Sequence, residues 1–183
     1  MGRLAAGAEL KIVDEDGAEA GAGQAGEILI RGDAGMREYW KDPEATARAF
    51  VDGWIRTSDV GRMDEDGYLY LVDRKQEMII SGGFNIYPRE VEQAIESHPA
   101  VLEVCVVGVP DDEWGEAVKA VAVLKEGAQA TEAEIIEHCR LRLGKYKKPR
   151  SVEFAAQLPK NATGKLLRRV LRERYWEGRQ RKI

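Results

Sequence analysis

The sequence predicts an α+β fold in two parts joined by a short polar segment. Residues 1–72 are short patterned runs separated by Gly- and Asp-rich turns, which is typical of β-structure. Residues 77–183 alternate strand-like and helical runs in the order β-α-β-β-α-β-α, which indicates a small α+β domain. Residues 73–76 interrupt the apolar pattern between the two parts, as a joint between domains does.

In the first part four strands are expected, at residues 9–13, 27–31, 54–63 and 68–72. The first two alternate between apolar and polar side chains, and the last two flank an Asp-Glu-Asp-Gly turn that predicts a hairpin. Asp42 followed by Pro43 predicts a short helix that ends by residue 50, because aspartate caps helix starts and proline suits the first helical position.

In the second part four strands are expected at residues 78–80, 101–109, 117–124 and 151–154, and three helices at residues 88–97, 131–143 and 165–175. The pair Gly82 and Gly83 breaks the chain after the first strand, because glycine accepts positive φ and allows close approach. Thr131 and Glu134 form a capping box at the second helix, which Gly144 is expected to end. The last helix should turn four apolar residues inward: Leu166, Leu167, Val170 and Leu171.

Composition excludes several classes of protein. With 44% hydrophobic and 33% charged residues the chain is globular rather than disordered, and a net charge of −4 argues against a nucleic-acid partner. No apolar run approaches the ~18 residues that span a bilayer. Residues 160–183 hold nine Lys or Arg against two acids, so this tail carries about +7. Such a tail suits phosphates, or it is simply a solvated helix face.

The cysteines and histidines indicate neither disulfides nor a metal site. Cys105 lies in an apolar run and Cys139 on the apolar side of a helix, so both are expected to be buried thiols in a reducing compartment. His98 and His138 have no metal-ligand spacing to each other or to a cysteine. We therefore expect a cytoplasmic protein without a bound metal.

Two short motifs carry candidate groups for nucleotide and phosphate chemistry. In residues 54–59, Trp-Ile-Arg-Thr-Ser-Asp, the carboxylate of Asp59 can accept two hydrogen bonds from a ribose diol, or simply cap its own turn. In residues 159–165, Pro-Lys-Asn-Ala-Thr-Gly-Lys, the glycine allows a tight turn and Lys165 supplies a mobile cation for charge that builds on a phosphate. Lys160 is the weaker candidate, and the alternative for Lys165 is the start of a surface helix.

Together with Asp73-Arg-Lys-Gln and Met78-Ile-Ile-Ser-Gly-Gly-Phe-Asn-Ile-Tyr-Pro-Arg-Glu-Val-Glu, these motifs resemble those of the adenylate-forming acyl-CoA synthetases. That superfamily includes fatty-acyl- and aryl-CoA ligases, luciferases and peptide-synthetase adenylation domains. The resemblance implies that residues 1–72 are the β-rich end of a large N-terminal domain, residues 73–76 a hinge, and residues 77–183 the mobile C-terminal domain.

The resemblance also implies roles in the nucleotide site and the hinge. Asp59 would bind the ATP ribose and Arg74 the nucleotide, although Ser58 stands where the family has glycine. Asp73 would belong to the hinge, and Gln76 would be its pivot, where the family has Asp or Lys.

For catalysis, the resemblance implies that Lys165 reaches the substrate carboxylate and the α-phosphate during adenylation. For the thiol substrate it implies that Ser81, Gly82 and Gly83 line a pantetheine tunnel. An aromatic and basic set would hold the adenine and phosphates of CoA: Trp114, Tyr146, Lys148 and Arg150. The alternative is that Trp114 packs as a lid on the core and that the lysines are solvated.

The implied activity joins a fatty or aryl acid to CoA through acyl-AMP, using ATP with Mg²⁺ and releasing AMP and pyrophosphate. The chain holds no Ser/Thr/Gly-rich phosphate loop with lysine and no Tyr-Gly-x-Thr-Glu segment. We therefore expect a C-terminal fragment that needs a missing large domain and is inactive alone. The alternatives are a non-catalytic CoA-binding or assembly module and an adenylation fragment that serves a carrier protein. Exposed strand edges would also favour a homodimer.

Overall fold

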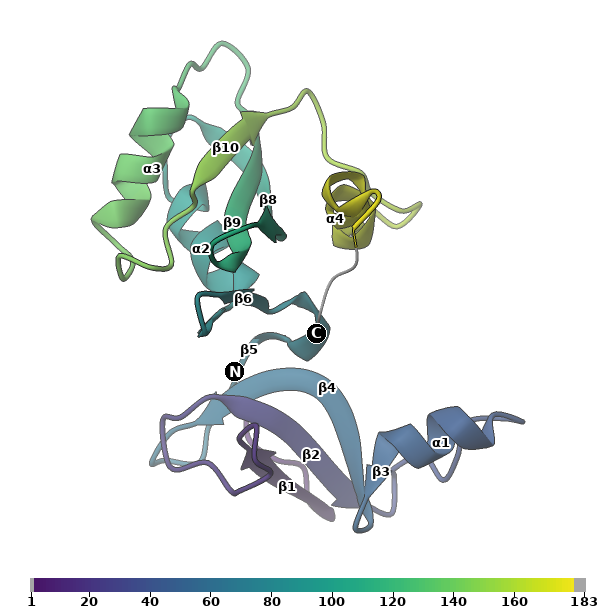
Figure 1. Ribbon diagram of the computed structural model, residues 1–183. Coiled ribbons are helices and arrows are strands. Elements are labelled where there is room, and N and C mark those ends of the chain that lie inside the picture. The colour runs from purple at the N-terminus through teal and green to yellow at the C-terminus, as the bar shows by residue number, and fades with distance from the viewer. Residues whose placement is uncertain (1, 180–183) are drawn as a thin grey trace. The chain divides into compact units, whose positions relative to one another are not determined.

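The computed structural model describes residues 2–179, and the chain divides into two compact units, Met1–Gln76 and Glu77–Ile183 (Figure 1). Each unit is built on its own five-stranded sheet and buries its own apolar residues. The α+β fold class predicted from the sequence is confirmed. The boundary between the units follows Gln76 directly.

The first unit is an antiparallel sheet with one short helix. The elements are β1 (Ala8–Val13), β2 (Gly26–Gly32), α1 (Pro43–Ala49), β3 (Phe50–Val51), β4 (Trp54–Met63) and β5 (Leu69–Arg74). The strands are ordered β1-β2-β4-β3, and β5 also pairs with β4. The apolar residues Ile12, Ile28 and Val60 are buried in this unit, and burial in β1 and β2 extends to adjacent residues instead of alternating along the strand.

Aspartates set the turns and the helix start of the first unit. Asp42 caps α1, because its Oδ1 accepts a backbone N–H of the first turn at 2.9 Å. Asp64 organises the β4–β5 hairpin, since its Oδ1 accepts the N–H groups of Asp66 at 3.1 Å and Tyr68 at 2.8 Å. The bond from Tyr68 is the main cause that lowers the pKa of Asp64. The strand β5 continues to Arg74, so strand pairing includes two residues of the segment predicted as a joint.

The second unit has helices on both faces of its sheet (Figure 1). The elements are β6 (Ile79–Ser81), β7 (Phe84–Ile86), α2 (Pro88–Glu96), β8 (Val101–Asp111), β9 (Gly115–Leu124), α3 (Glu132–Arg140), β10 (Ser151–Phe154) and α4 (Arg168–Trp176). The strand order is β10-β9-β6-β7, and β8 pairs along the length of β9. The β9–β10 pair is parallel, and the other pairs of this sheet are antiparallel.

The side chains of β8 alternate between two apolar clusters. Val104 and Val106 lie in the cluster that α2 and α3 cover, and Cys105 and Val107 lie in the cluster that α4 reaches through Leu171. All four β8 residues are at most 1% exposed. Burial on both faces explains why this strand is a continuous apolar run instead of an alternating one.

Two boundaries in the second unit differ from the sequence prediction. The first predicted strand is a hairpin, β6 and β7, which turns at the paired glycines. The helix α3 ends at Arg140 and not at Gly144. It ends early because the N–H groups of Arg142 and Leu143 both turn back to the carbonyl oxygen of Cys139, at 3.0 and 2.9 Å.

The helix α4 begins at Arg168 and not at residue 165. The preceding backbone is held elsewhere, because the N–H of Leu167 donates to the carbonyl of Pro159 at 2.8 Å and Leu166 bridges to Lys160. Of the four residues predicted to face inward, Leu171 is buried and Leu166 is half-buried. The prediction is wrong for the other two, because Leu167 is 37% exposed and Val170 is 45% exposed.

Both cysteines are buried in the core of the second unit. Burial raises the pKa of the Cys105 thiol to about 12 and that of Cys139 to about 11, so both are inert apolar residues.

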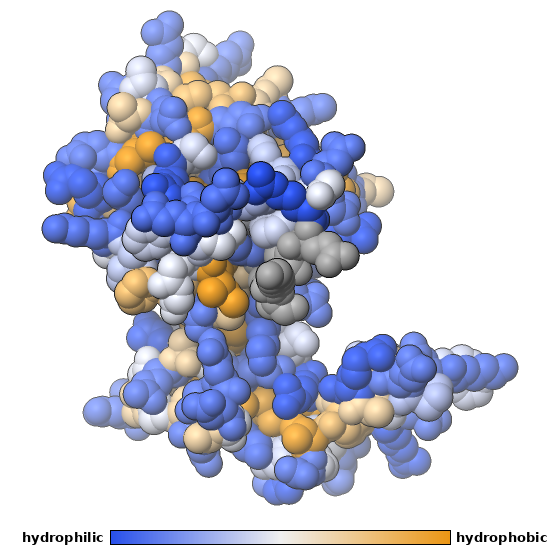
Figure 2. All heavy atoms as spheres, in the orientation of Figure 1, coloured by the Kyte–Doolittle hydropathy of each residue, from blue (hydrophilic) through white to orange (hydrophobic). Residues whose placement is uncertain are grey.

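Within residues 2–179, no group of three or more potential metal ligands gathers. None of the helices in that range combines the length and apolar composition needed to cross a bilayer. Hydrophilic side chains dominate the face shown in Figure 2.

The core of the second unit can be tested with two apolar residues of opposite burial. Ile95 is fully buried, so Ile95→Ala should lower the free energy of unfolding by about 2–5 kcal/mol. Leu102 is 61% exposed, so the control Leu102→Ala should change it by less than about 0.5 kcal/mol. Urea-induced unfolding followed by circular dichroism measures both, and equal losses would contradict the two-sided core.

Candidate functional site

A pocket of about 290 Å³ in the second unit gathers most of the residues predicted to bind CoA. Its lining consists of Ser81, Trp114, Val118, Lys145, Tyr146, Lys148 and Arg150. These residues come from the tip of the β6–β7 hairpin, from the β8–β9 turn, from β9 and from the segment before β10. The volume lies near the lower end of the usual range for small-molecule pockets.

The tip of the β6–β7 hairpin requires glycine. Gly82 and Gly83 have φ of +57° and +81°, which disfavour any residue with a side chain. A Cβ atom on Gly82 would lie 2.3 Å from the indole of Trp114, and the N–H of Gly82 donates to the carbonyl of Trp114 at 2.9 Å. The close approach predicted from the glycine pair is therefore made to the protein's own tryptophan.

Asp111 holds the aromatic and basic side of the pocket together. Its Oδ1 accepts the backbone N–H groups of Trp114 at 2.9 Å and of Glu113 at 3.1 Å, and its Oδ2 pairs with Arg150 at 2.8 Å. The bond from Trp114 is the largest of the causes that lower the pKa of Asp111. The guanidinium of Arg150 lies 5.8 Å from the centre of the Trp114 ring. Trp114 is 39% exposed, so the indole is not a lid sealed over the core.

The segment before β10 brings a stacked aromatic ring and lysines to the pocket. Tyr146 stacks on Phe84 with ring centres 4.7 Å apart. Lys147 is held by both carboxylate oxygens of Glu90 at 2.7 Å. The ammonium group of Lys148 forms no ion pair with any residue between 2 and 179. The pocket therefore offers aromatic faces and cations, which suit a flat ring that carries phosphates.

The loop that carries Lys165 is held in shape by its own residue Asn161. Oδ1 of Asn161 accepts the N–H of Thr163 at 3.0 Å and that of Lys165 at 2.9 Å. Gly164 has φ of +82°, as the predicted tight turn requires. The side chain of Lys165 is exposed and forms no ion pair in the described part of the chain, whereas Lys160 pairs with Glu103 at 2.5 Å. The loop does not line the pocket.

The two residues predicted to bind the nucleotide are neighbours in the first unit. Asp59 and Arg74 are paired across β4 and β5, and the Arg74 Nε lies 3.5 Å from the Asp59 Oδ1. Ser58 has φ of +60°, a region that glycine occupies freely and serine seldom adopts. The side-chain oxygen of Thr57 accepts the N–H of Asp59 at 3.1 Å and so fixes the turn after this strained residue.

The predicted hinge residues lie at the end of the first unit. The Oδ1 of Asp73 accepts the N–H of Arg74 at 2.7 Å. Lys75 donates to the buried carboxylate of Glu27 at 2.8 Å. Gln76 is exposed and is the last residue of this unit.

Several residues of the site have no assigned role in the sequence prediction, among them Val118, Lys145, Phe84 and Asp111. Lys145 and Val118 lie outside the quoted motifs, whereas Phe84 lies within the motif that begins at Met78 but has no role assigned there. Asp111 had a local signal, because an aspartate three residues before Trp114 can cap the intervening turn. Its pairing with Arg150 depends on the folded sheet and had no signal in the sequence.

The second unit matches a known family. Residues 90–165 match the AMP-binding enzyme C-terminal domain. The chain therefore carries the C-terminal domain of the AMP-binding enzyme family, which confirms the resemblance of its motifs.

Individual relatives of the chain are long-chain-fatty-acid–CoA ligases. It is 45% identical over 174 residues to FadD13 of Mycobacterium tuberculosis and 50% identical over 160 residues to a ligase of Bacillus subtilis. These matches cover 95% and 87% of this chain but 34% and 29% of the relatives. ATP-bound MatB from Rhodopseudomonas palustris matches with a TM-score of 0.90 and 39% identity, over 95% of this chain and 35% of that protein. The chain thus spans about a third of the length of these relatives.

The backbone at Ser58 can be tested by restoring glycine. Ser58→Gly should raise the free energy of unfolding of the first unit by about 1 kcal/mol, because it removes the Cβ from a left-handed conformation. Ser58→Ala is the control, since it keeps the Cβ and should give no gain. Thermal unfolding of both variants measures the difference, and a stabilised alanine variant would contradict the strain.

Proposed function

We propose that this chain forms the C-terminal part of an ATP-dependent acyl-CoA synthetase, which converts a fatty or aryl acid, ATP and CoA to acyl-CoA, AMP and pyrophosphate. The observation that carries the proposal is the pocket of the second unit, in which aromatic faces, cations and the glycine hairpin meet. The long-chain-fatty-acid–CoA ligases among the relatives support this substrate class.

In the proposed first half-reaction, the substrate carboxylate attacks the α-phosphorus of ATP, acyl-AMP forms and pyrophosphate leaves. Asp59 accepts hydrogen bonds from the ribose hydroxyls, and Arg74 beside it orients Asp59 and the nucleotide. Lys165 stabilises the charge that builds on the phosphate, because an exposed ammonium on a flexible stem can follow that charge. Magnesium would enter with ATP as part of the substrate.

In the proposed second half-reaction, the CoA thiolate attacks the carbonyl carbon of acyl-AMP, and AMP leaves. The adenine of CoA stacks against Trp114 or Tyr146, and Lys148 and Arg150 meet its phosphates. The hairpin at Ser81–Gly83 guides the pantetheine arm, since its glycines present backbone without side chains.

The two half-reactions need different groups of the second unit at one reaction centre. Lys165 and the pocket lie on separate segments, so a rotation about Gln76 would exchange them. The neutral amide of Gln76 can take part in such a hinge, because a change in φ and ψ needs no charge. The buried thiols of Cys105 and Cys139 suit a reducing compartment such as the cytoplasm.

The proposal includes the need for a preceding large domain that binds the acyl group and the ATP phosphates. The chain by itself should form no acyl-CoA. A non-catalytic CoA-binding module is the second candidate, because the pocket is assembled entirely from residues of the second unit.

Lys165 can be tested in a chimera in which this chain replaces the matching C-terminal segment of the Bacillus subtilis ligase. Lys165→Ala should lower fatty-acid-dependent ATP–pyrophosphate exchange by about 100-fold or more, because a cation is lost from the transition state. Thioester formation from supplied acyl-AMP should change little. The control Lys160→Ala should leave both rates nearly unchanged, and equal losses in the two lysine variants would contradict the assignment.

CoA binding can be tested by calorimetric titration of the chain itself. Lys148→Gln should weaken CoA binding by about tenfold, and added salt should weaken the wild-type affinity, because the lysine acts on phosphate charge. Trp114→Ala should weaken CoA and dephospho-CoA alike, because it removes a stacking face. The surface variant Arg169→Gln is the control. Binding that is insensitive to both pocket variants would exclude this pocket as the CoA site.

A further inference from the structure

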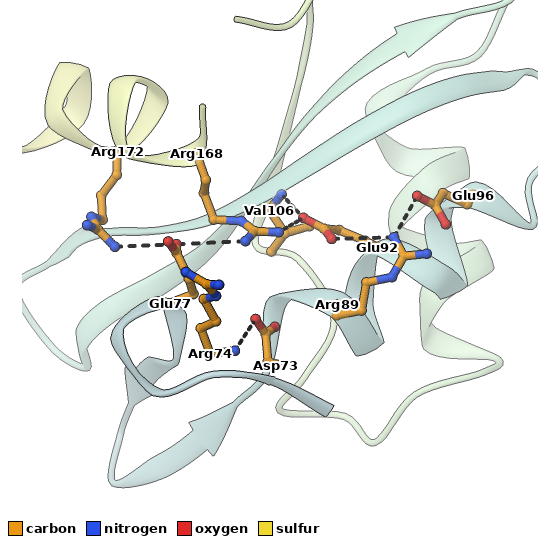
Figure 3. Close-up of polar contacts among 9 residues, drawn as sticks. All are labelled: Asp73, Arg74, Glu77, Arg89, Glu92, Glu96, Val106, Arg168 and Arg172. Atoms are coloured by element: carbon orange, nitrogen blue, oxygen red, sulfur yellow. Dashed lines mark hydrogen bonds and ion pairs between the residues drawn. The ribbon is translucent and has the colours of Figure 1, made fainter. Parts of the chain in front are cut away.

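Six charged side chains of alternating sign form a connected series through the second unit, which we call the ionic series (Figure 3). Its order is Glu96, Arg89, Glu92, Arg168, Glu77 and Arg172. The closest pair joins the Arg168 Nη2 to the Glu92 Oε1 at 2.6 Å. Figure 3 shows Glu92 between Arg168 and Arg89, and Arg168 and Arg172 directed from α4 toward Glu77.

Glu92 is the buried centre of the ionic series. Its side chain is 3% exposed, and its Oε1 also accepts the N–H of Val106 in the middle of β8 at 3.0 Å. Burial disfavours the charge of Arg168, but the carboxylate of Glu92 outweighs that effect, so the pKa of Arg168 is raised. A buried pair of this kind is costly to break, because one charge is left without compensation. The start of α4 is therefore firmly fixed to α2 and β8.

Glu77 connects the same arginine to the hinge. It is the first residue of the second unit, and its Oε2 lies 3.8 Å from the Arg168 Nη1 and 3.5 Å from the Arg172 Nη1. The two arginines are four residues apart on α4 and so share one helix face. In the first unit, Lys75 is paired with Glu27 at 2.8 Å. Each neighbour of Gln76 is thus bound within its own unit, which leaves Gln76 as the residue between two anchored positions.

Arg168 also ends the loop that carries Lys165. Only two residues separate them, and the backbone of the second, Leu167, is bonded to Pro159 at 2.8 Å. The carbonyl of Lys165 accepts the N–H of Asn161 at 2.9 Å, which closes the loop on itself. A displacement of Arg168 would therefore move the whole loop, whereas the CoA pocket is built from other segments.

We propose that Arg168 is a positioning residue that joins the hinge exit at Glu77 to the Lys165 loop, so that rotation about Gln76 delivers the lysine as part of one rigid body. The catalytic meaning of this inference rests on the proposed function, whereas the mechanical connection rests on the contacts alone. Lys165 would then need no movement of its own relative to Glu77, and the hinge position alone would decide whether it reaches the reacting phosphate.

The mechanical connection can be tested on the chain itself by amide hydrogen exchange measured with NMR. Arg168→Lys and Glu77→Gln should each accelerate exchange of the Lys165 and Leu167 amides by about tenfold, because each weakens the ion pair between Glu77 and Arg168. The β8–β9 amides report whether the unit stays folded and should remain protected. Arg169→Gln, which alters an exposed pair on the same helix, is the matched control.

The double variant separates coupling from general loosening. If Arg168 transmits the effect of Glu77, the two substitutions together should accelerate exchange by less than the product of their single effects. Unchanged loop exchange in Arg168→Lys with protected β8–β9 amides would overturn the connection. So would multiplicative effects in the double variant.

The catalytic consequence can be tested in the same chimera with the Bacillus subtilis ligase. Arg168→Lys should lower ATP–pyrophosphate exchange by about tenfold and leave thioester formation from supplied acyl-AMP within about twofold. Equal losses in both half-reactions would overturn the positioning role. An inactive wild-type chimera would count against the proposed function alone. The mechanical connection would still stand on the amide hydrogen exchange of the chain itself, which requires no catalysis.

Discussion

The burial of β8 and β9 on both faces is the constraint on which the second unit depends. Neighbouring side chains of β8 serve different clusters, so α2 and α3 on one face and α4 on the other are fixed to the same pair of strands. Both candidate functional segments are attached to this frame. The pocket lies where β8 turns into β9, and the Lys165 loop leads into α4. The pocket and the Lys165 loop, which serve the two half-reactions of the proposed cycle, are therefore both attached to one rigid core.

Much of the fold follows from local patterns in the sequence, and the exceptions have a common physical cause. Capping residues such as Asp42 and Thr131 act on their own helix, so a sequence pattern is sufficient to place those helix starts. The start of α4 depends instead on the bond between Leu167 and Pro159, which exists only after the loop has closed. Glu92 is spaced with Val91 and Ile95 on the buried face of α2, but its partner Arg168 stands 76 residues away. The position of Glu92 on that face has a local signal, but the identity of its partner has none.

The residues of the candidate site also fall into two groups, those that the sequence identifies and those whose role depends on the folded structure. The resemblance to the family's motifs was sufficient to select Ser81, Trp114 and Arg150, which the structure brings to one pocket. It was also sufficient to single out Ser58 as a departure from glycine, and the left-handed backbone there gives that departure a physical meaning. The supporting role of Asp111 required the sheet register, which places it opposite Gly115 and next to the turn that Trp114 ends. Residues that hold other residues are harder to predict than residues that face a ligand.

The contact between Gly82 and Trp114 couples the tip of the β6–β7 hairpin to the indole in the pocket, so neither can move without the other. A ligand ring that displaced the Trp114 indole would also displace the tip of the β6–β7 hairpin at Gly82. A ligand chain bound along that tip would in turn change how the indole contacts a ring. Linkage requires these effects to be equal in both directions. A molecule that occupied both places would therefore experience a coupling between its two ends through the protein. Two short fragments that occupy the same places would help or hinder each other without touching.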